Sequence, residues 1–245
     1  MHRFFVKEDQ IQEDKIWICG SDVNHIKNVL RMKPGEKVFL SCGNDLEYEC
    51  SLEEFGEDGI CARILDIHGM ETELETELIL YQGLPKGDKM EWIIQKAVEL
   101  GVSKIVPVRM KRCVVKLDAK KAKKKVSRWN GIAQSAAKQA RRGKIPVVTE
   151  VIDFKEAMED AKSLDMFLVP YEAAKGMEHS RELFQKAKEK KSIGIIIGPE
   201  GGFDKEEIKA AKLAGGNVLT LGKRILRTET AGMTMLSILM FLLEK

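Results

Sequence analysis

The chain has 245 residues, of which 44% are hydrophobic, and a formal net charge of +3 at pH 7. This length and composition suit one large domain or two modest ones, and they exclude a disordered chain. The five cysteines have no C-x-x-C spacing and form no metal-ligand pattern with the four histidines, which indicates a reducing cytoplasm without disulfides or zinc.

Residues 1–72 are expected to form a small β-barrel. The first ten residues lack the apolar core of a signal peptide. Turn signals separate short stretches rich in β-branched and aromatic residues, namely RFFV, KIWIC, KVFLSC, YECSLEEF and ICARILDI. A short amphipathic helix capped by Ser21 is predicted after the second stretch. Its apolar face would consist of Val23, Ile26, Val29 and Leu30. A polar, acidic stretch near residue 72 marks the predicted domain boundary.

Residues 73–245 are expected to form a mainly parallel α/β sheet with helices on both faces, because strand-like and helical stretches alternate. The predicted strands are ELILYQGL, KIVPV, DMFLVP, SIGIIIG and NVLTLG. Helices are predicted from Asp88 to Gly101, along a basic segment, and from Asp204 with a capping box at Glu207. The apolar run 231–243 would span about 20 Å as a helix, too short for a hydrocarbon core of about 30 Å. We therefore expect a core helix there and no membrane anchor.

Positive charge is concentrated in one segment. Thirteen Lys or Arg residues and one acid, Asp118, lie between Lys111 and Lys144, so this segment carries +12 while the whole chain carries +3. The lysines at 120–125 could simply form a solvated helix face. Apolar residues recur at helical spacing beyond them and would dock the helix, leaving its cations for a polyanion. Those apolar residues are Trp129, Ile132, Ala133, Ala136, Ala137 and Ala140.

Three predicted strand ends lead into loops with the features of a ligand site: FLVPYE, IIGPEGGF and LGKRILRTETA. None matches a phosphate-binding loop, so a nucleoside triphosphate is disfavoured. Backbone without side chains suits an adenine or a ribose, with Glu200 accepting a hydrogen bond from a hydroxyl. The alternative is that Gly198, Gly201 and Gly202 only form tight turns before a capped helix.

Six stretches, in this order across nearly the whole chain, carry a family resemblance: MHRFF, HIKNVLRM, KGDKMEWIIQKAVELGV, RWNGIAQSAAKQARR, IGPEGGF followed by EEI, and LGKRILRTETA. They resemble the RsmE family of ribosomal RNA uridine N3-methyltransferases in the SPOUT superfamily. The resemblance implies an N-terminal PUA-like β-barrel and a C-terminal α/β domain with a trefoil knot. It also implies a homodimer, S-adenosylmethionine as methyl donor, and a uridine of small-subunit (16S) rRNA, free or in the assembled subunit, as acceptor. Lys138 departs from the family, which often has Glu there.

The resemblance also implies which residues hold the methyl donor. One loop would contribute Leu168, Val169 and Pro170, and a second would contribute Ile197, Gly198, Glu200 and Gly201. The third would contribute Leu221, Gly222, Ile225, Leu226, Arg227 and Thr230. For RNA we favour Arg3, His25 and Arg31 in the barrel and Arg112, Lys138, Arg141 and Arg142 in the basic segment, although for His25 alone packing is the better interpretation.

Methylation at uracil N3 requires loss of the N3 proton. Arg227 is expected to stabilise the developing anion, but a guanidinium that stays charged cannot be the base. Glu229 and Glu200 are candidate bases only if burial raises their pKa above about 4.3, so we rank positioning above base catalysis. Arg227 and Glu229 could instead form a structural ion pair. The alternative functions are a methyltransferase for another RNA, such as tRNA, or an RNA-binding protein without catalysis.

Overall fold

The computed structural model describes residues 1–174 and 176–244 and contains two compact units. The first unit consists of Met1–Glu73 and Ala137–Ile145, and the second consists of Leu74–Ala136 and Pro146–Lys245. Residues 73–245 are predicted from the sequence to form one domain. The short segment Ala137–Ile145 instead packs with the first unit.

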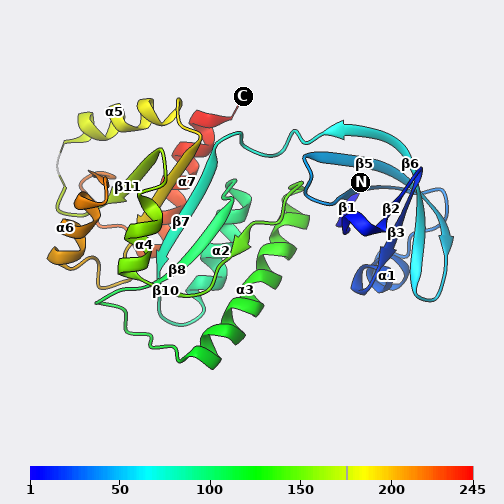
Figure 1. Ribbon diagram of the computed structural model, residues 1–245, viewed down its shortest axis with the longest axis horizontal. Helices are drawn as coiled ribbons and strands as arrows, with labels where there is room; N and C mark the ends of the chain where they lie inside the picture. Colours follow the sequence, from blue (N-terminus) through cyan, green and yellow to red (C-terminus); the bar gives the residue numbers. More distant parts are fainter. Residues whose placement is uncertain (175, 245) are drawn as a thin grey trace. The chain divides into compact units, whose positions relative to one another are not determined.

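The first unit is built on a six-stranded sheet in the order β1-β4-β5-β6-β3-β2 (Figure 1). Only the pair β1 and β4 is parallel. Inward-facing side chains such as Ile16, Leu40 and Leu52 form a separate apolar core. The elements are β1 (His2–Phe5), η1 (Glu8–Gln10), β2 (Ile11–Gln12), β3 (Lys15–Cys19), α1 (Ser21–Asn24), η2 (His25–Val29), β4 (Lys37–Ser41), β5 (Leu46–Phe55) and β6 (Gly59–Gly69).

The short helical segment of this unit differs from its prediction. Its N-cap is Gly20, without a side-chain hydrogen bond, and α1 begins at Ser21. A π-helical turn follows, in which the Leu30 N–H donates to the His25 carbonyl at 2.9 Å. This wider turn rotates later residues away from the α-helical register. Val29 is consequently 62% exposed, whereas Val23 and Ile26 are buried as predicted.

The second unit contains a parallel sheet in the order β10-β8-β7-β12-β11-β13, with β9 also paired to β8 (Figure 1). This confirms the predicted α/β class, while the trefoil knot stays a prediction. The elements are β7 (Glu77–Gly83), α2 (Lys89–Glu99), β8 (Lys104–Arg109), α3 (Ala119–Gln139), β9 (Val147–Val148), β10 (Ile152–Asp153), α4 (Phe154–Ala161), β11 (Met166–Pro170), α5 (Met177–Ala187), β12 (Ser192–Ile197), α6 (Lys205–Leu213), β13 (Asn217–Leu219) and α7 (Thr228–Leu243).

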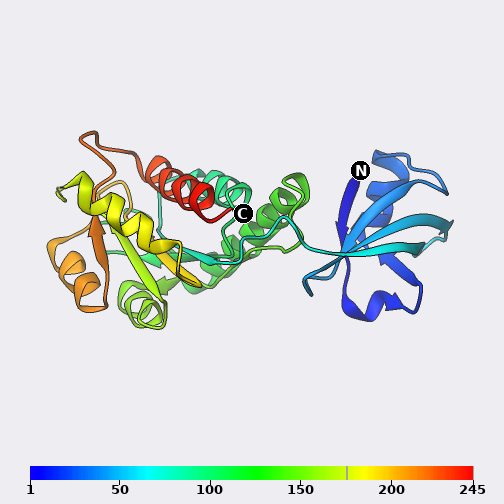
Figure 2. The same ribbon diagram turned by 90° about the horizontal axis from the view of Figure 1, so that it is seen from above.

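Helices cover both faces of this sheet, with α2 and α7 on one face and α4 on the other (Figure 2). Alternation along β7 directs Ile79 and Tyr81 into the core that α4 and α6 share. The Tyr81 hydroxyl donates to Asp160 of α4 at 2.6 Å. Burial, together with this carboxylate, raises the pKa of Tyr81. Both α4 and α5 were missing from the sequence prediction.

The C-terminal helix α7 contains one charged residue, Glu229, and begins at Thr228, three residues before the predicted apolar run. Met235, Leu236 and Leu239 are buried against the rest of the unit. Within residues 1–174 and 176–244, no helix combines the length and the apolar character that a membrane span requires.

The segment Ala137–Ile145 is held to the first unit by a largely buried ion pair. The Arg142 side chain is 6% exposed and pairs with Glu73, which also accepts from the Gly143 N–H at 2.9 Å. Ser41 donates to the Gly143 carbonyl at 2.7 Å. Arg142 therefore lies inside the fold, which corrects its assignment as an RNA contact.

Replacing Arg142 by Ala is expected to destabilise the first unit by about 3–5 kcal/mol, because Glu73 would keep a buried charge without its partner. Arg141→Ala is the matched control, since Arg141 is exposed and such changes stay within about 0.5 kcal/mol. Urea denaturation of the full chain measures both variants. Equal stability of the two would contradict the role given to the pair.

Candidate active site

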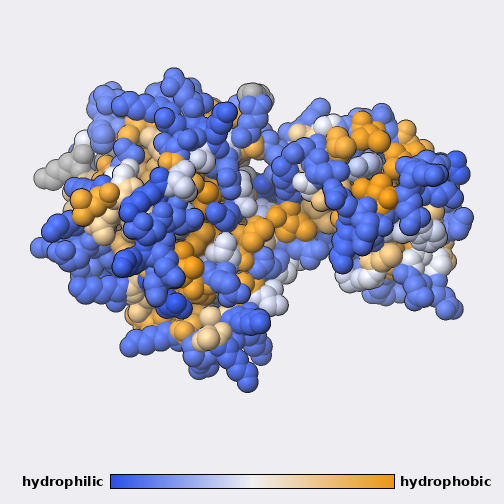
Figure 3. Space-filling model, viewed as in Figure 1, coloured by the Kyte–Doolittle hydropathy of each residue, from blue (hydrophilic) through white to orange (hydrophobic). Residues whose placement is uncertain are grey.

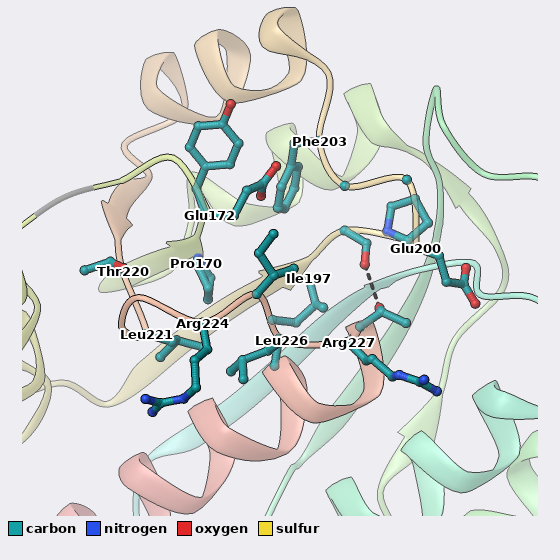
Figure 4. A pocket seen from close by; sticks show the side chains of 18 of the residues that line it. Pro170, Glu172, Ile197, Glu200, Phe203, Thr220, Leu221, Arg224, Leu226 and Arg227 are labelled. Carbon is teal, nitrogen blue, oxygen red and sulfur yellow. Dashed lines mark hydrogen bonds between the residues drawn. The ribbon is translucent and has the colours of Figure 1, made fainter.

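A cavity of about 500 Å³ lies at the carboxyl ends of β11, β12 and β13 (Figure 4). The strands are parallel, so the loops that follow them meet at one edge of the sheet. The lining comprises Pro170, Tyr171 and Glu172 at the end of β11; Ile197, Gly198, Pro199, Glu200, Gly201, Gly202 and Phe203 at the end of β12; Thr220, Leu221, Gly222, Arg224, Ile225, Leu226 and Arg227 in the loop after β13; Thr228 and Ala231 of α7; and Lys89 of α2.

The loop after β12 is fixed from two sides. The Thr228 hydroxyl donates to the Gly198 carbonyl at 2.6 Å (Figure 4). Gln82 of β7 in turn donates to the Thr228 hydroxyl at 2.9 Å. All three residues are buried. A Cβ on Gly83 would lie 2.8 Å from the Pro199 backbone nitrogen, so only glycine permits this approach. The loop can therefore present backbone groups to a ligand in one defined position.

The same loop ends in the helix cap that the sequence predicted. Asp204 accepts from the Glu206 N–H at 3.2 Å, and Glu207 accepts from the Asp204 N–H at 2.8 Å. The Asp204 pKa is lowered, first by the hydrogen bond from Lys111 and then by the Glu206 N–H. The loop both turns into a capped helix and lines a cavity. A turn before a helix and a backbone that meets a ligand are therefore compatible interpretations of its glycines.

Lys89 connects the two carboxylates that the sequence proposed as bases. Its ammonium nitrogen lies 3.0 Å from Glu200 Oε1 and 3.3 Å from Glu229 Oε2. The Lys86 N–H also donates to Glu200 at 3.1 Å. The side chains of Glu200 and Glu229 are 26% and 15% exposed, so solvent only partly screens this group. We call Lys89, Glu200 and Glu229 the carboxylate clamp.

The clamp keeps Glu200 ionised. Desolvation alone would raise the pKa of Glu200, but its own backbone N–H, the Lys89 ammonium and the Lys86 N–H outweigh that effect and lower the pKa. Conversely, the hydrogen bond to Glu200 raises the pKa of Lys89 despite desolvation. Glu200 is therefore a weaker base than an ordinary glutamate, and Lys89 stays protonated.

Two arginines lie on the loop that leads into α7. Arg224 and Arg227 extend to opposite sides of the cavity, and Arg227 points to the side where Glu200 lies (Figure 4). Glu229 pairs with Lys89 instead of Arg227, and within the described residues Arg227 has no ion-pair partner. The alternative of an Arg227–Glu229 structural ion pair is therefore wrong.

Ten of the thirteen residues expected to hold the donor line this one cavity: Pro170, Ile197, Gly198, Glu200, Gly201, Leu221, Gly222, Ile225, Leu226 and Arg227. The other three do not. Leu168 and Val169 are fully buried within β11, and Thr230 lies in the first turn of α7, where its carbonyl accepts from Thr234. These three residues are not part of the cavity lining.

Several lining residues escaped the sequence analysis. Lys89 comes from α2, remote in sequence from the three loops, and no local pattern pointed to it. Tyr171 and Glu172 lay in a quoted strand end, and Arg224 and Thr228 lay within the LGKRILRTETA stretch. The remaining additions are Pro199, Phe203, Thr220 and Ala231. Gly202, which also lines the cavity, was one of the three glycines considered for a ligand.

The residues expected to contact RNA fall into two groups. Three already have partners: Arg3 pairs with Glu47 and has a 7% exposed side chain, Lys138 pairs with Asp22 at 2.6 Å, and exposed His25 meets Phe4 edge-on. Arg31, Arg112 and Arg141 are exposed, although Arg112 also donates to the Gly201 carbonyl at 3.1 Å and pairs with Asp204 at 3.7 Å. Exposed cations without buried partners are the better candidates for a polyanion.

Comparison with known proteins identifies the class to which this fold and site belong. A family described as RNA methyltransferase domain matches residues 72–240, and one described as RNA methyltransferase PUA domain matches residues 18–65. Ribosomal RNA small subunit methyltransferase E of Bacillus subtilis is 37% identical over 100% of this chain and 98% of its own length. The enzyme of that name from Mesomycoplasma hyopneumoniae is 35% identical, with 97% and 98% covered.

A solved structure agrees with these matches. A ribosomal RNA small subunit methyltransferase E from Neisseria gonorrhoeae, bound to S-adenosyl methionine, superposes with a TM-score of 0.84 at 31% identity, covering 99% of this chain and 98% of that one. The class is that of RNA methyltransferases with a PUA domain. Within it, the chain belongs to the RsmE family, which confirms the resemblance seen in the sequence.

Replacing Lys89 by Met is expected to raise the pKa of Glu200, because the ammonium that favours its charged form is lost while Glu229 remains. A depressed folded pKa stabilises the protein above the unfolded pKa, and that contribution disappears as the pH falls through the folded pKa. In the variant, the stabilisation that ionised Glu200 contributes should therefore be lost at a higher pH. Carboxyl NMR titration measures the Glu200 pKa directly.

Lys86→Ala is the matched control for this titration, since it removes a neighbouring exposed lysine side chain but retains the backbone N–H that binds Glu200. Its Glu200 pKa should stay low. An unchanged Glu200 pKa in the Lys89 variant would exclude the clamp as the cause of the shift.

Proposed function

We propose that the protein transfers the methyl group of S-adenosylmethionine to N3 of a uridine in small-subunit ribosomal RNA. The observation that carries this proposal is the cavity at three strand ends, which Arg227 and residues of the carboxylate clamp line. Relatives of the chain are named for small-subunit rRNA methylation. Five free cysteines and a ribosomal substrate are consistent with action in the cytoplasm.

The cavity residues fit such a donor. Its volume of about 500 Å³ is within the usual small-molecule range of about 300–1,000 Å³. Ile197, Leu221 and Leu226 supply apolar surface for an adenosine, and Gly222, at φ +116°, supplies backbone without a side chain. Glu172 and Glu200 line the cavity and would attract a cationic sulfonium. S-adenosylmethionine supplies an activated methyl group on that sulfonium.

We assign to Arg227 the contact with the uracil that accepts the methyl group. Uracil N3 has no free lone pair until its proton leaves, and the negative charge then spreads to the carbonyl oxygens. An exposed guanidinium without an ion-pair partner among the described residues can direct its N–H donors at such an oxygen. Arg227 thus stabilises the anion at the moment when it can attack.

The carboxylate clamp favours positioning over general-base catalysis. An ordinary glutamate pKa of about 4.3 is already low for removing a weakly acidic imide proton. The hydrogen bonds from Lys89 and the Lys86 N–H lower the pKa of Glu200 further, which weakens it as a base. Lys89 also pairs with Glu229 at 3.3 Å. Alignment of acceptor and donor can itself contribute about 7–11 kcal/mol to lowering the barrier. The clamp would then fix the wall of the site beside Arg227.

The basic helix α3 supports an RNA substrate. Its first turns present exposed Lys120, Lys121, Lys123 and Lys124, and the region where α3 begins is mostly hydrophilic in Figure 3. Ala122, Val126 and Trp129 are buried and dock the opposite side of the helix. Exposed cations held on a docked helix suit a phosphate backbone, and this part of the binding should weaken steeply with salt.

Incubation with small ribosomal subunits from a strain lacking the enzyme is expected to produce N3-methyluridine, detected by nucleoside mass spectrometry. Arg227→Ala should reduce kcat by about 100-fold or more, as the loss of one donor to a developing anion does elsewhere, with a smaller loss of donor binding. Lys223→Ala, an exposed cation outside the cavity lining, is the control and should stay near wild type.

Persistence of N3-methyluridine in rRNA of the deletion strain would show that the substrate is another RNA. No binding of S-adenosylmethionine at millimolar concentration would favour a protein that binds RNA without catalysis. Equal losses of turnover and donor binding in Arg227→Ala would return Arg227 to a structural role.

We further propose a homodimer that covers the outer side of α7. Phe241 is 79% exposed on this almost uncharged helix, and Trp92 on the neighbouring helix α2 is 41% exposed. Apolar surface of this kind is typical of an interface. A second copy of the chain, related by a twofold axis, can cover both patches at once.

Phe241→Glu is expected to shift the protein from dimer to monomer in sedimentation velocity, because the interface would then bury an unpaired charge. Leu213→Glu is the control, since Leu213 is 80% exposed on α6, a different helix. A monomeric wild-type protein would contradict the homodimer.

A further inference from the structure

The segment that follows β8 contacts the glycine-containing loop after β12, which forms one wall of the active-site cavity. Arg112 lies in this segment, and its guanidinium Nη1 donates to the Gly201 carbonyl at 3.1 Å. The second terminal nitrogen, Nη2, lies 3.7 Å from Asp204 Oδ2. Gly201 lines the cavity, and Asp204 is the N-cap of α6. One side chain therefore connects the cavity wall to the start of the helix that follows it.

The backbone of the same segment packs directly on this loop. A Cβ on Gly201 would lie 2.9 Å from the Arg112 Cβ and 3.2 Å from the Arg112 carbonyl oxygen, so this close approach requires glycine. The Lys111 N–H donates to Glu207 Oε1 at 2.8 Å, and Glu207 is buried in α6. These contacts fix the position from which the Arg112 side chain extends, so its hydrogen bond to Gly201 has a defined geometry.

The peptide group between Gly201 and Gly202 is the part of the loop that needs this restraint. Its N–H, that of Gly202, donates to the Pro199 carbonyl at 2.9 Å and closes a turn. Its carbonyl, that of Gly201, accepts from Arg112. Gly202 has φ +64°, and neither flanking residue carries a Cβ that would resist rotation of the peptide plane. The two hydrogen bonds therefore hold this peptide from opposite sides.

We propose that Arg112 is a positioning residue for the methyl donor, an inference that rests on the proposed function. By holding the Gly201 carbonyl, Arg112 keeps the backbone of the cavity wall, and the adjacent Glu200, in the conformation that receives the donor. Without this hydrogen bond the loop would sample orientations that do not bind. The apparent affinity for the donor would then fall in proportion to the fraction of molecules in the competent conformation.

The shape of the guanidinium suits this role. Its nitrogens lie in one rigid plane, so Nη1 and Nη2 address two acceptors at once, whereas a lysine ammonium is a single charge on a flexible stem. The Arg112 side chain is 45% exposed, yet these two nitrogens lie against Gly201 and Asp204. The proposed role differs from the RNA contact expected from the sequence. The two roles predict opposite results, because one acts on the donor and the other on RNA.

Arg112→Ala is expected to weaken binding of S-adenosylmethionine in calorimetry by about three- to tenfold, the effect of one lost hydrogen bond. With small ribosomal subunits as substrate, KM for the donor should rise in proportion. The kcat at saturating donor and the salt dependence of RNA binding should not change. Arg112→Lys should restore only part of the donor affinity. Lys116→Ala removes another exposed cation of the same segment and is the matched control, which should bind the donor like wild type.

Hydrogen exchange of the Gly202 amide tests the restraint without donor or RNA. Exchange should be faster in Arg112→Ala than in wild type and in Lys116→Ala, because the carbonyl side of this peptide is no longer held. Wild-type donor affinity or an unchanged exchange rate in Arg112→Ala would overturn the inference and leave the proposed function intact. A smaller salt slope of RNA binding, with donor affinity unchanged, would make Arg112 an RNA contact instead. Wild-type protein that binds no donor would overturn the proposed function, and the positioning role with it.

Discussion

The hydrogen bond from the Thr228 hydroxyl to the Gly198 carbonyl is the contact on which the active site depends. It joins the loop after β12 to the first turn of α7, and Gln82 extends the link to β7. A glycine-containing loop is flexible unless other contacts fix it, because glycine loses more conformational freedom on folding than any other residue. The buried network supplies that restraint, so one loop can wall a cavity and present Glu200 to Lys89.

The arrangement divides the work of the site between two kinds of side chain. Lys89 pairs with Glu200 and Glu229, while Arg227 keeps its charge available at the cavity. A cation without an ion-pair partner among the described residues can respond to charge that appears only during the reaction, whereas a paired carboxylate cannot easily accept a proton. The geometry therefore favours positioning and anion stabilisation over proton abstraction.

The sequence predicted the parts of the site that depend on local pattern. Strand ends, the Asp204–Glu207 capping box and the two glycine- and arginine-containing loops are all local, and these loops meet in the structure because parallel strands end at one edge. Contacts between remote segments could not be predicted this way. Lys89 reaches Glu229, Arg142 is buried against Glu73, and a π-helical turn exposes Val29, and no periodicity encodes any of these.

Calorimetric titration with S-adenosylmethionine tests most directly the claim that the three strand-end loops form the donor site. Wild-type protein should bind, and Gly83→Ala should bind at least tenfold more weakly, because the added carbon would displace the backbone at Pro199. Gly131→Ala, where a Cβ meets no atom within 4 Å, should bind like wild type. Absence of binding by the wild type, or equal affinity in all three proteins, would contradict the account.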